Sequence, residues 1–167
     1  MVDLLEQRAD VAIRVGPLHS SQLVARKLGE SRMVVVASPQ YLKRRGVPKT
    51  LADLSAHNLV SFNFARTLEG WPFRENGTPV SHPAVGNVQV GDGETARQLA
   101  LAGVGLTRLA LFHTSADIKA GRLKPVLQHL NPGDTEAIHA VFIGQGGHLP
   151  ARIRAFIDYL AEHVRLR

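Results

Sequence analysis

Runs of apolar residues along the chain predict short strands separated by helices. Residues 33–37, Met-Val-Val-Val-Ala, are apolar at every position, which is typical of a strand buried on both faces of a covered sheet. Strands that alternate with helices indicate the α/β class, and we expect a largely parallel sheet. The predicted strands are 10–15, 23–28, 32–38, 59–64, 85–90, 104–110, 124–130 and 137–144.

Capping residues mark the predicted helix ends. Ser38 suits the N-cap, Pro39 the first helical position and Gly46 the position after the last turn, so we expect a helix over 39–45. Similar signals predict four more helices: 51–56 with a capping box at Thr50 and Asp53, 93–102 closed by Gly103, 111–120 closed by Gly121, and one from about Pro150 onward.

Two further patterns refine these elements. The dipeptide Asn76-Gly77 favours a tight hairpin turn, so 71–80 is predicted to form two short strands. The last helix carries a clear apolar stripe made of Ile153, Phe156, Ile157, Leu160 and Val164.

Composition places the chain among ordinary soluble domains, with 44% hydrophobic and 20% charged residues in 167. No apolar run approaches the roughly 20 residues that a membrane helix needs. The first ten residues lack the charged and apolar regions of a secretory signal. The absence of cysteine excludes disulfides and thiolate metal sites and fits a cytoplasmic location.

A net charge of +6 raises the question of nucleic-acid binding. The longest basic run is Lys43-Arg44-Arg45, at the predicted end of a short helix, where cations interact favourably with the helix dipole. No aromatic residues are interleaved with it to stack on bases. We favour a solvated helix end over a nucleic-acid patch.

Residues 91–96 read G-x-G-x-x-A after a predicted strand, as in a dinucleotide-binding loop. Such a loop needs an acid about twenty residues later, and the next acid there is Asp117, in the middle of a predicted helix. We therefore expect no nucleotide cofactor. Asp92 is a good N-cap, which leaves two readings open: a small-anion site at the helix start, or a capped helix alone.

Other catalytic or metal-binding patterns are missing from the sequence. The eight histidines include no H-E-x-x-H motif and no pair at helical i, i+4 spacing. There is no G-x-S-x-G nucleophile elbow and no phosphate-binding G-x-x-x-x-G-K motif. We predict no metal site, no cofactor and no catalytic residues.

Five segments, in order, resemble the effector-binding domain of LysR-type transcriptional regulators. They read VDLLEQRADVAIRVG, LVARKLGESRMVVVASPQYLKRRGVPKTLADLSAHNLVSF, VGDGETARQLALAGVGLTRLA, AGRLKPVL and RIRAFIDYLAEHV, and together extend over about 2–164. The resemblance implies a two-lobed α/β fold similar to type 2 periplasmic-binding proteins. By that mapping, 1–30 and 128–167 form the first lobe and 31–127 the second.

The resemblance also implies a small-molecule cleft between the lobes. The residues that would line it are Ile13, Arg14, Val15, Gly16, Phe62, Asn63, Phe64, Gly91, Asp92, Gly93, Glu94, Gly103, Val104 and Gly105. Arg14 is our candidate for meeting an anionic effector, opposite the amides of Asp92 and Gly93. The alternative role for Arg14 is a surface salt bridge.

Members of this family begin with a winged helix-turn-helix and further elements of the first lobe, and this chain starts after them. We expect DNA binding only through that missing module, and an incomplete first lobe whose exposed apolar sheet edge promotes homo-oligomer formation. The predicted function is a ligand-sensing regulatory domain in the cytoplasm, without membrane contact. The alternative is a solute-binding protein of a transport system.

Overall fold

The computed structural model describes residues 9–16, 18, 23–63, 70–143, 149–164 and 166. The chain divides into two compact units. Unit 1 combines Met1–Ser31 with Thr135–Arg167, and unit 2 is the continuous segment Arg32–Asp134. The backbone therefore passes between the units twice, at 31–32 and at 134–135.

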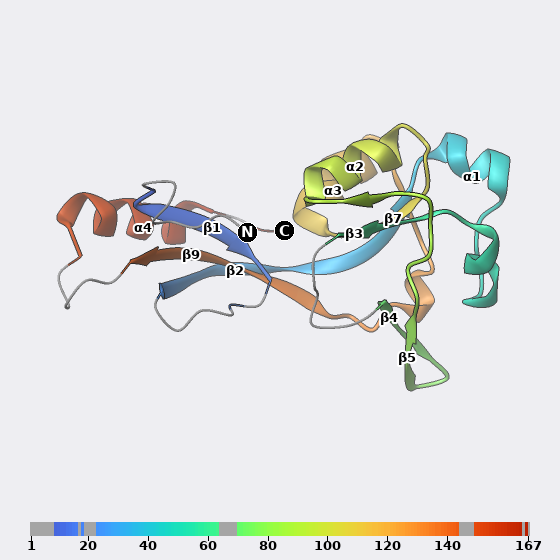
Figure 1. Cartoon of the computed structure of the whole chain (residues 1–167), viewed down its shortest axis with the longest axis horizontal. Coiled ribbons are helices and arrows are strands. Elements are labelled where there is room, and N and C mark those ends of the chain that lie inside the picture. Colours follow the sequence, from blue (N-terminus) through green and yellow to red (C-terminus); the bar gives the residue numbers. More distant parts are fainter. Residues whose placement is uncertain are drawn as a thin grey trace. The chain divides into compact units, whose positions relative to one another are not determined.

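Helices separate groups of strands along the chain, and in its described part four strands, β3 to β6, follow one another without a helix between them (Figure 1). The elements, including two short 3₁₀ helices η1 and η2, are β1 Val11–Val15, β2 Leu23–Ala37, α1 Pro39–Arg45, η1 Ala52–Ala56, β3 Leu59–Phe62, β4 Trp71–Glu75, β5 Thr78–His82, β6 Gln89–Val90, α2 Gly93–Leu101, β7 Leu106–Ala110, α3 Leu111–Lys119, β8 Lys124–Val126, η2 Gln128–Leu130, β9 Thr135–Ile143 and α4 Ala151–His163.

One long strand replaces the two that were predicted over 23–28 and 32–38. β2 continues through Gly29 without a turn. A Cβ atom at Gly29 would lie 2.9 Å from a methyl carbon of Leu166, so this glycine permits close packing rather than a chain reversal. The first half of β2 belongs to unit 1 and the second half to unit 2.

The prediction of a largely parallel sheet is wrong. β1 pairs antiparallel with β9, and β2 pairs antiparallel with both β7 and β8. Only the β3–β6 and β3–β7 pairs are parallel among those the structure defines. The reversal arises because β2 enters unit 2 directly from unit 1, without the crossover helix that would make it parallel to its neighbours.

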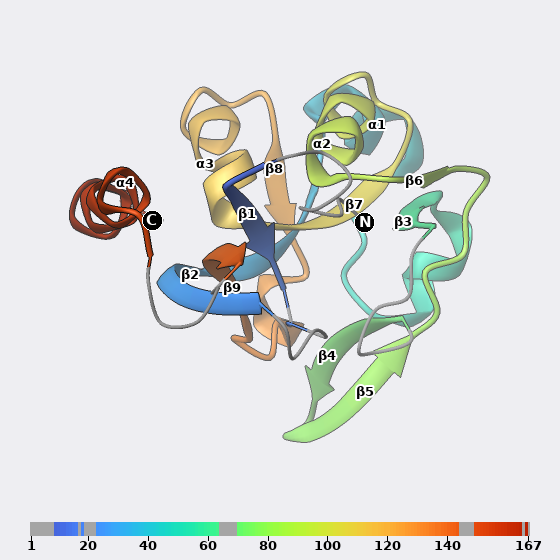
Figure 2. The same cartoon turned by 60° about the vertical axis from the view of Figure 1, so that its left-hand side comes forward.

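The sheet of unit 2 is covered on both faces, as the run 33–37 predicted. The helices α2 and α3 lie side by side (Figure 2). Val34 and Val36 pack against residues of these two helices, while Val35 and Ala37 pack on the other face against α1 and the β4–β5 hairpin. All five residues of Met33–Ala37 are buried. Alternate side chains of one strand thus belong to two different cores.

Local signals at α1, η1 and the hairpin are confirmed. The Ser38 hydroxyl accepts the N–H of Tyr41, and α1 ends at Gly46. The capping box also forms, because Asp53 accepts the N–H of Thr50 at 2.9 Å and Thr50 accepts that of Asp53 at 3.3 Å.

The β4–β5 hairpin turns at Asn76 and Gly77, with φ of 49° and 81°. These left-handed angles are those of the turn that the Asn-Gly dipeptide favours.

Two predicted strands are shorter than expected. Of 85–90, only Gln89–Val90 is a strand. The predicted strand 124–130 ends at Val126, because Leu127 adopts a left-handed φ of 54° and a 3₁₀ turn follows. A left-handed leucine is a backbone conformation that hydropathy does not reveal.

Unit 1 contains β1, β9, the first half of β2 and the helix α4. Ile153 and Ile157 of α4 pack against Ala140 and Phe142 of β9. Phe156, which belongs to the apolar stripe in the sequence, is 50% exposed. The buried face of α4 is narrower than its apolar sequence pattern.

Candidate functional site

The parallel strands β3, β6 and β7 end at a common edge of unit 2. Phe62 lies opposite Val90, and the N–H of Asn63 donates to the Val90 carbonyl at 3.0 Å. We call this the carboxyl edge of unit 2; α2 and α3 both begin there. Open α/β sheets bind ligands at such an edge. Phe64, also predicted in the site, lies outside the described residues.

Asp92 caps α2 at this edge, as predicted. Its Oδ1 accepts the N–H of Thr95 at 2.8 Å and its Oδ2 accepts the Thr95 hydroxyl at 2.7 Å. These bonds, the backbone one first, hold the pKa of Asp92 below its ordinary value. The Asp92 carboxylate therefore already binds one of the backbone N–H donors at the start of α2.

His113 lies against the first residue of α2 and was not predicted as part of the site. A Cβ atom at Gly93 would lie 2.7 Å from Nε2 of His113, so only glycine fits beneath the imidazole. Burial lowers the pKa of His113, while the carboxylates of Glu94 and Asp92 act in the opposite direction. The only sequence signal for His113 is its place just after the carboxyl end of a strand.

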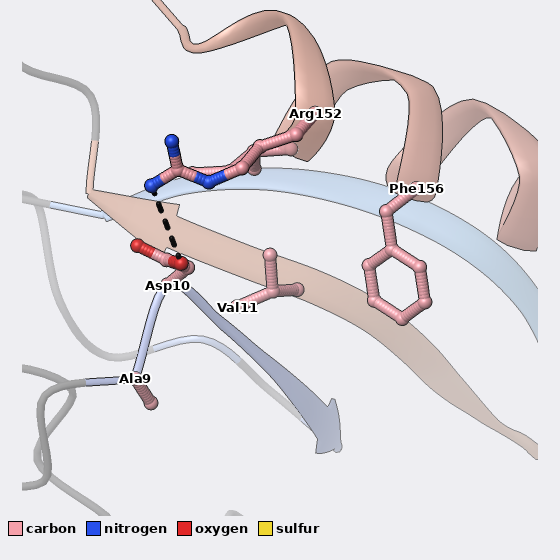
Figure 3. A pocket seen from close by; sticks show the side chains of 6 residues that line it. Ala9, Asp10, Val11, Arg152 and Phe156 are labelled. Atoms are coloured by element: carbon pink, nitrogen blue, oxygen red, sulfur yellow. Dashed lines mark ion pairs between the residues drawn. The ribbon is translucent and has the colours of Figure 1, made fainter.

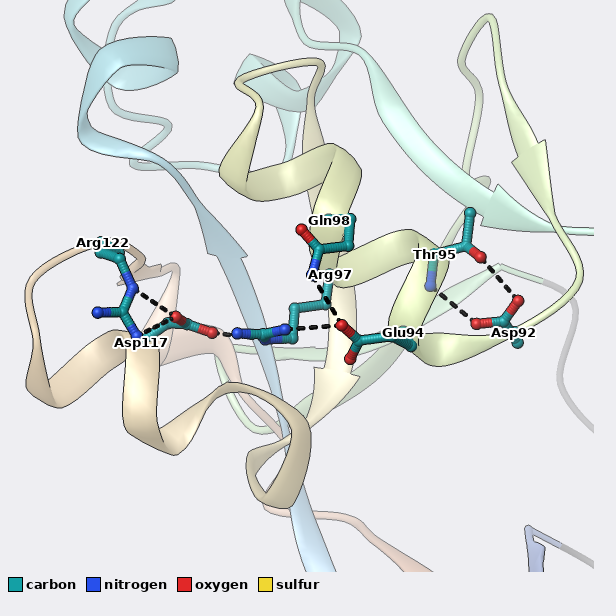
Figure 4. Close-up of polar contacts among 7 residues, drawn as sticks. All are labelled: Asp92, Glu94, Thr95, Arg97, Gln98, Asp117 and Arg122. Carbon is teal, nitrogen blue, oxygen red and sulfur yellow. Dashed lines mark hydrogen bonds and ion pairs between the residues drawn. The ribbon is translucent and has the colours of Figure 1, made fainter.

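A chain of ion pairs joins the start of α2 to α3 (Figure 4). The Asp117 side chain is completely buried and accepts Nε–H of Arg97 at 2.6 Å and Nε–H of Arg122 at 2.7 Å. Arg97 also donates through Nη1 to Glu94 at 2.7 Å. The Arg97 hydrogen bond, followed by that of Arg122, lowers the pKa of Asp117 despite its burial.

Three predicted site residues lie at the opposite end of α2. Gly103 accepts a hydrogen bond from Arg44 of α1, and the carbonyl of Val104 accepts one from Asn58. A Cβ atom at Gly105 would come within 2.3 Å of the Asn58 carbonyl. Because the segment 103–105 precedes β7 rather than following it, the structure does not bring it to the carboxyl edge.

The remaining predicted residues lie in unit 1, at the end of β1. Arg14 pairs with His139 and Val15 with Ile138 across the antiparallel β1–β9 ladder. Gly16 follows with a φ of 92°, a conformation that favours glycine, and its N–H donates to Ala137 at 2.9 Å. Their roles in ligand binding stay predictions.

A hollow of about 380 Å³ opens at the other end of β1 (Figure 3). Arg152 of α4 and Asp10 face each other across it at 3.7 Å. Both side chains are largely exposed. None of its lining residues was predicted as a site residue; they are Ala9, Asp10, Val11, Arg152, Ile153 and Phe156.

Among the described residues, no three histidine or carboxylate side chains gather in the way that a metal ion requires. The helices within those residues are also too short or too polar to cross a bilayer.

A family model described as the LysR substrate binding domain matches residues 1–165. The chain is 32% identical over 164 residues to the HTH-type transcriptional regulator CrgA of Neisseria meningitidis (serogroup C strain 8013), covering 98% of this chain and 54% of CrgA. It is 28% identical over 165 residues to the HTH-type transcriptional regulator DmlR of Escherichia coli K12, with 98% and 54% covered. The chain thus spans about half the length of these curated relatives.

Solved structures agree with the sequence matches. The CrgA regulatory domain superposes with a TM-score of 0.83 at 31% identity, covering 96% of this chain and 78% of that one. The full-length virulence activator AphB of Vibrio cholerae gives 0.76 at 28% identity, with 98% and 54% covered. The fold is that of these regulatory domains, which have a two-lobed architecture like that of type 2 periplasmic-binding proteins.

Proposed function

The chain belongs to the LysR substrate-binding-domain family, and we propose that it is the ligand-sensing domain of a transcriptional regulator, taking a small effector between its two units. The observation that carries this proposal is the carboxyl edge of unit 2. There the ends of β3 and β6 and the starts of α2 and α3 bring together Asn63, Asp92, Gly93, Glu94 and His113.

The two compact units serve as the two lobes, joined by two strand passages. On the side of unit 2 the passages are tied together: the N–H of Met33 donates to the Asp134 carbonyl at 3.1 Å, and Asn131 donates to the Met33 carbonyl at 2.7 Å. The guanidinium of Arg108 adds an ion pair with the Asp134 carboxylate. Met33 and Asp134, which adjoin the two passages, are thereby held to each other within unit 2.

Signalling requires the effector to bind two lobe arrangements with different affinities. The arrangement that the effector favours then changes the spacing between the DNA-binding segments of the complete regulator. Those segments contact DNA, and this domain does not. The named relatives are regulators and not enzymes, which supports a role without catalysis. Homo-oligomer formation through exposed apolar surface of unit 1 belongs to the same proposal.

A library of small metabolites, screened for an increase in the melting temperature of the 167-residue chain, tests the proposal. At a ligand concentration 100 times Kd, binding stabilises the folded state by about 2.7 kcal/mol, enough to raise the melting temperature by several degrees. A library without any stabilising compound contradicts the proposal.

Two variants then locate the site for any compound that binds. His113→Ala removes a side chain of the carboxyl edge, and we expect it to weaken binding at least tenfold. His82→Ala is the matched control, since it removes a half-buried histidine on the β4–β5 hairpin, which is not part of the predicted site. Equal losses in both variants, or a loss only in His82→Ala, would place the ligand elsewhere.

A further inference from the structure

The buried carboxylate of Asp117 is paired with more positive charge than it carries. Arg97 and Arg122 both bind it, so the three groups together have a net charge of +1. Glu94 supplies the balancing charge through Nη1 of Arg97. The group of four is neutral only while Glu94 stays in place.

The two carboxylates on Arg97 differ in how firmly they are held. Asp117 is fully buried, so breaking its pair with Arg97 would deprive a carboxylate of a partner that solvent cannot replace. Glu94 is 58% exposed and is reached by Arg97 from one turn further along the same helix. Its Oε1 also accepts a hydrogen bond from Nε2 of Gln98 at 2.8 Å, and this contact is exposed too. Exposed side-chain pairs of this spacing contribute little net free energy, so Glu94 can leave Arg97 and Gln98 at low cost.

We propose that Arg97 binds a carboxylate group of the effector, and that Glu94 occupies this position until the ligand replaces it. The inference rests on the proposed function and names the ligand class for its site. It assigns recognition of the anion to Arg97 in unit 2, a residue that the sequence pattern did not select.

Geometry supports this assignment. Asp117 fixes the guanidinium of Arg97 through Nε, and Nη1 is directed toward Glu94 in the first turn of α2 (Figure 4). A planar guanidinium held in one orientation is well suited to a carboxylate, and fixing it in advance lowers the entropy cost of binding. The Arg97 side chain is 21% exposed, so a ligand can reach it from solvent.

Glu94 and Asp92 also repel a ligand carboxylate that approaches Arg97. Both carboxylates stand at the start of α2, and hydrogen bonds keep the pKa of each below its ordinary value. A ligand carboxylate that leaves Glu94 in place would meet two like charges. Displacement of Glu94 is therefore part of binding, and the ligand gains the Nη1 donor that Glu94 gives up.

Sodium acetate is the probe for the test, titrated into the ¹⁵N-labelled 167-residue chain, with sodium chloride over the same range as reference. We expect acetate to shift the amide signals of residues 93–97 beyond the chloride effect. Glu94→Gln removes the competing charge and should tighten acetate binding about fivefold. Arg97→Gln should abolish it.

Arg97→Lys serves as the second variant, because it keeps a cation beside Asp117 if Arg97→Gln fails to fold. Lysine lacks the planar fork, so acetate binding should weaken in this variant while the fold is retained. Glu75→Gln and Arg74→Gln make the same charge changes on the β4–β5 hairpin and should leave acetate binding unchanged.

Acetate shifts that persist in Arg97→Lys at full strength, or a Glu94→Gln variant without tighter binding, overturn the inference. If library compounds bind the chain while acetate binding ignores Arg97, only this inference fails. If acetate binding follows Arg97 but no library compound binds, the carboxylate position stands and the proposed function fails.

Discussion

Unit 1 and unit 2 differ in how completely they bury their apolar side chains. Six of the eight large hydrophobic side chains exposed among the described residues belong to unit 1, although unit 2 is the longer segment; the six are Ile13, Val15, Leu18, Val24, Phe156 and Tyr159. Within the part of the chain that the structure describes, unit 2 has three apolar clusters on the two faces of its sheet, and unit 1 has one cluster beneath α4.

The two units differ in apolar burial because the chain connects their strands and helices differently. Unit 2 is one continuous segment whose helices cover both faces of the sheet. Unit 1 is assembled from the two ends of the chain, and β1 is the last strand in the order of its described sheet. Unit 2 therefore buries most of its large apolar side chains within itself, whereas unit 1 leaves apolar surface that a further contact could cover.

The largest expected effect contrasts a buried ion pair in unit 2 with an exposed one in unit 1. Asp117→Ala leaves two arginines without their buried partner and should lower the free energy of unfolding by about 3–5 kcal/mol. Asp158→Ala breaks the exposed pair with Arg26 and should cost about 0–1 kcal/mol. Urea unfolding followed by circular dichroism measures both.

Fluorescence of Trp71, the single tryptophan of the chain, reports on unit 2 in the same samples. Similar losses for the Asp117 and Asp158 variants would contradict the contrast between the units.

Core truncation is the next test. Leu106 is fully buried in unit 2, so Leu106→Ala should lower the free energy of unfolding by about 2–5 kcal/mol. Phe156→Ala in unit 1 removes a half-exposed ring and should cost less than about 1 kcal/mol. Thermal or urea unfolding separates these values, and a Phe156→Ala loss as large as that of Leu106→Ala would show unit 1 to be fully packed at this position.

A smaller effect depends on pH and on His57 of unit 2. The Tyr41 hydroxyl accepts the N–H of Asn58 at 2.9 Å and lies 3.1 Å from Nδ1 of His57, an arrangement that suits a neutral imidazole accepting the hydroxyl hydrogen. Burial lowers the pKa of His57. Its contribution to stability is therefore complete above the unfolded pKa of about 6.5 and is lost as the pH falls below that value.

Melting temperatures between pH 8 and pH 5 check this dependence. The decrease at acid pH should be shallower in His57→Gln than in the unchanged chain. His129→Gln alters an exposed histidine and is the control. An identical acid decrease in the His57 variant would rule out this contribution.

A substitution at Ile13 of unit 1 should have the smallest effect on the free energy of unfolding. Its effect on self-association should be larger. This side chain is 51% exposed on the end strand, so Ile13→Lys should change the free energy of unfolding by no more than about 0.5 kcal/mol. A lysine there should weaken self-association, measured by sedimentation velocity. Val47→Lys, at an exposed valine of unit 2, should leave association unchanged.

A chain that stays monomeric at high concentration would remove the association argument altogether.

Residues close in sequence made the helices and the hairpin predictable. Ser38, Pro39 and Gly46 each act within the turn they belong to, and Asn76-Gly77 fixes its own turn angles. Strand direction was not predictable in this way. Whether β2 runs parallel or antiparallel to β7 depends on where the chain enters unit 2, which no local pattern records.

In the candidate site too, contacts between residues close in sequence were predictable, and contacts between distant residues were not. Asp92 was recognisable as an N-cap because its partner, Thr95, is three residues away. The contact of His113 with Gly93 and the pairing of Arg97 with Asp117 join residues twenty positions apart. The sequence places Asp117 in a helix, but only the packing of α2 on α3 turns it toward Arg97.

The sequence by itself determined the α/β class, the helix boundaries, the doubly buried strand and the family, because each rests on local spacing or on the order of short motifs. The tertiary structure decided the sheet directions, the separation of 103–105 from the carboxyl edge and the partners of Arg97. Those depend on which distant segments pack together. Hydrogen bonds from Arg97 and Arg122 then lower the pKa of Asp117, whereas burial lowers that of His113, and both effects arise only in the folded chain.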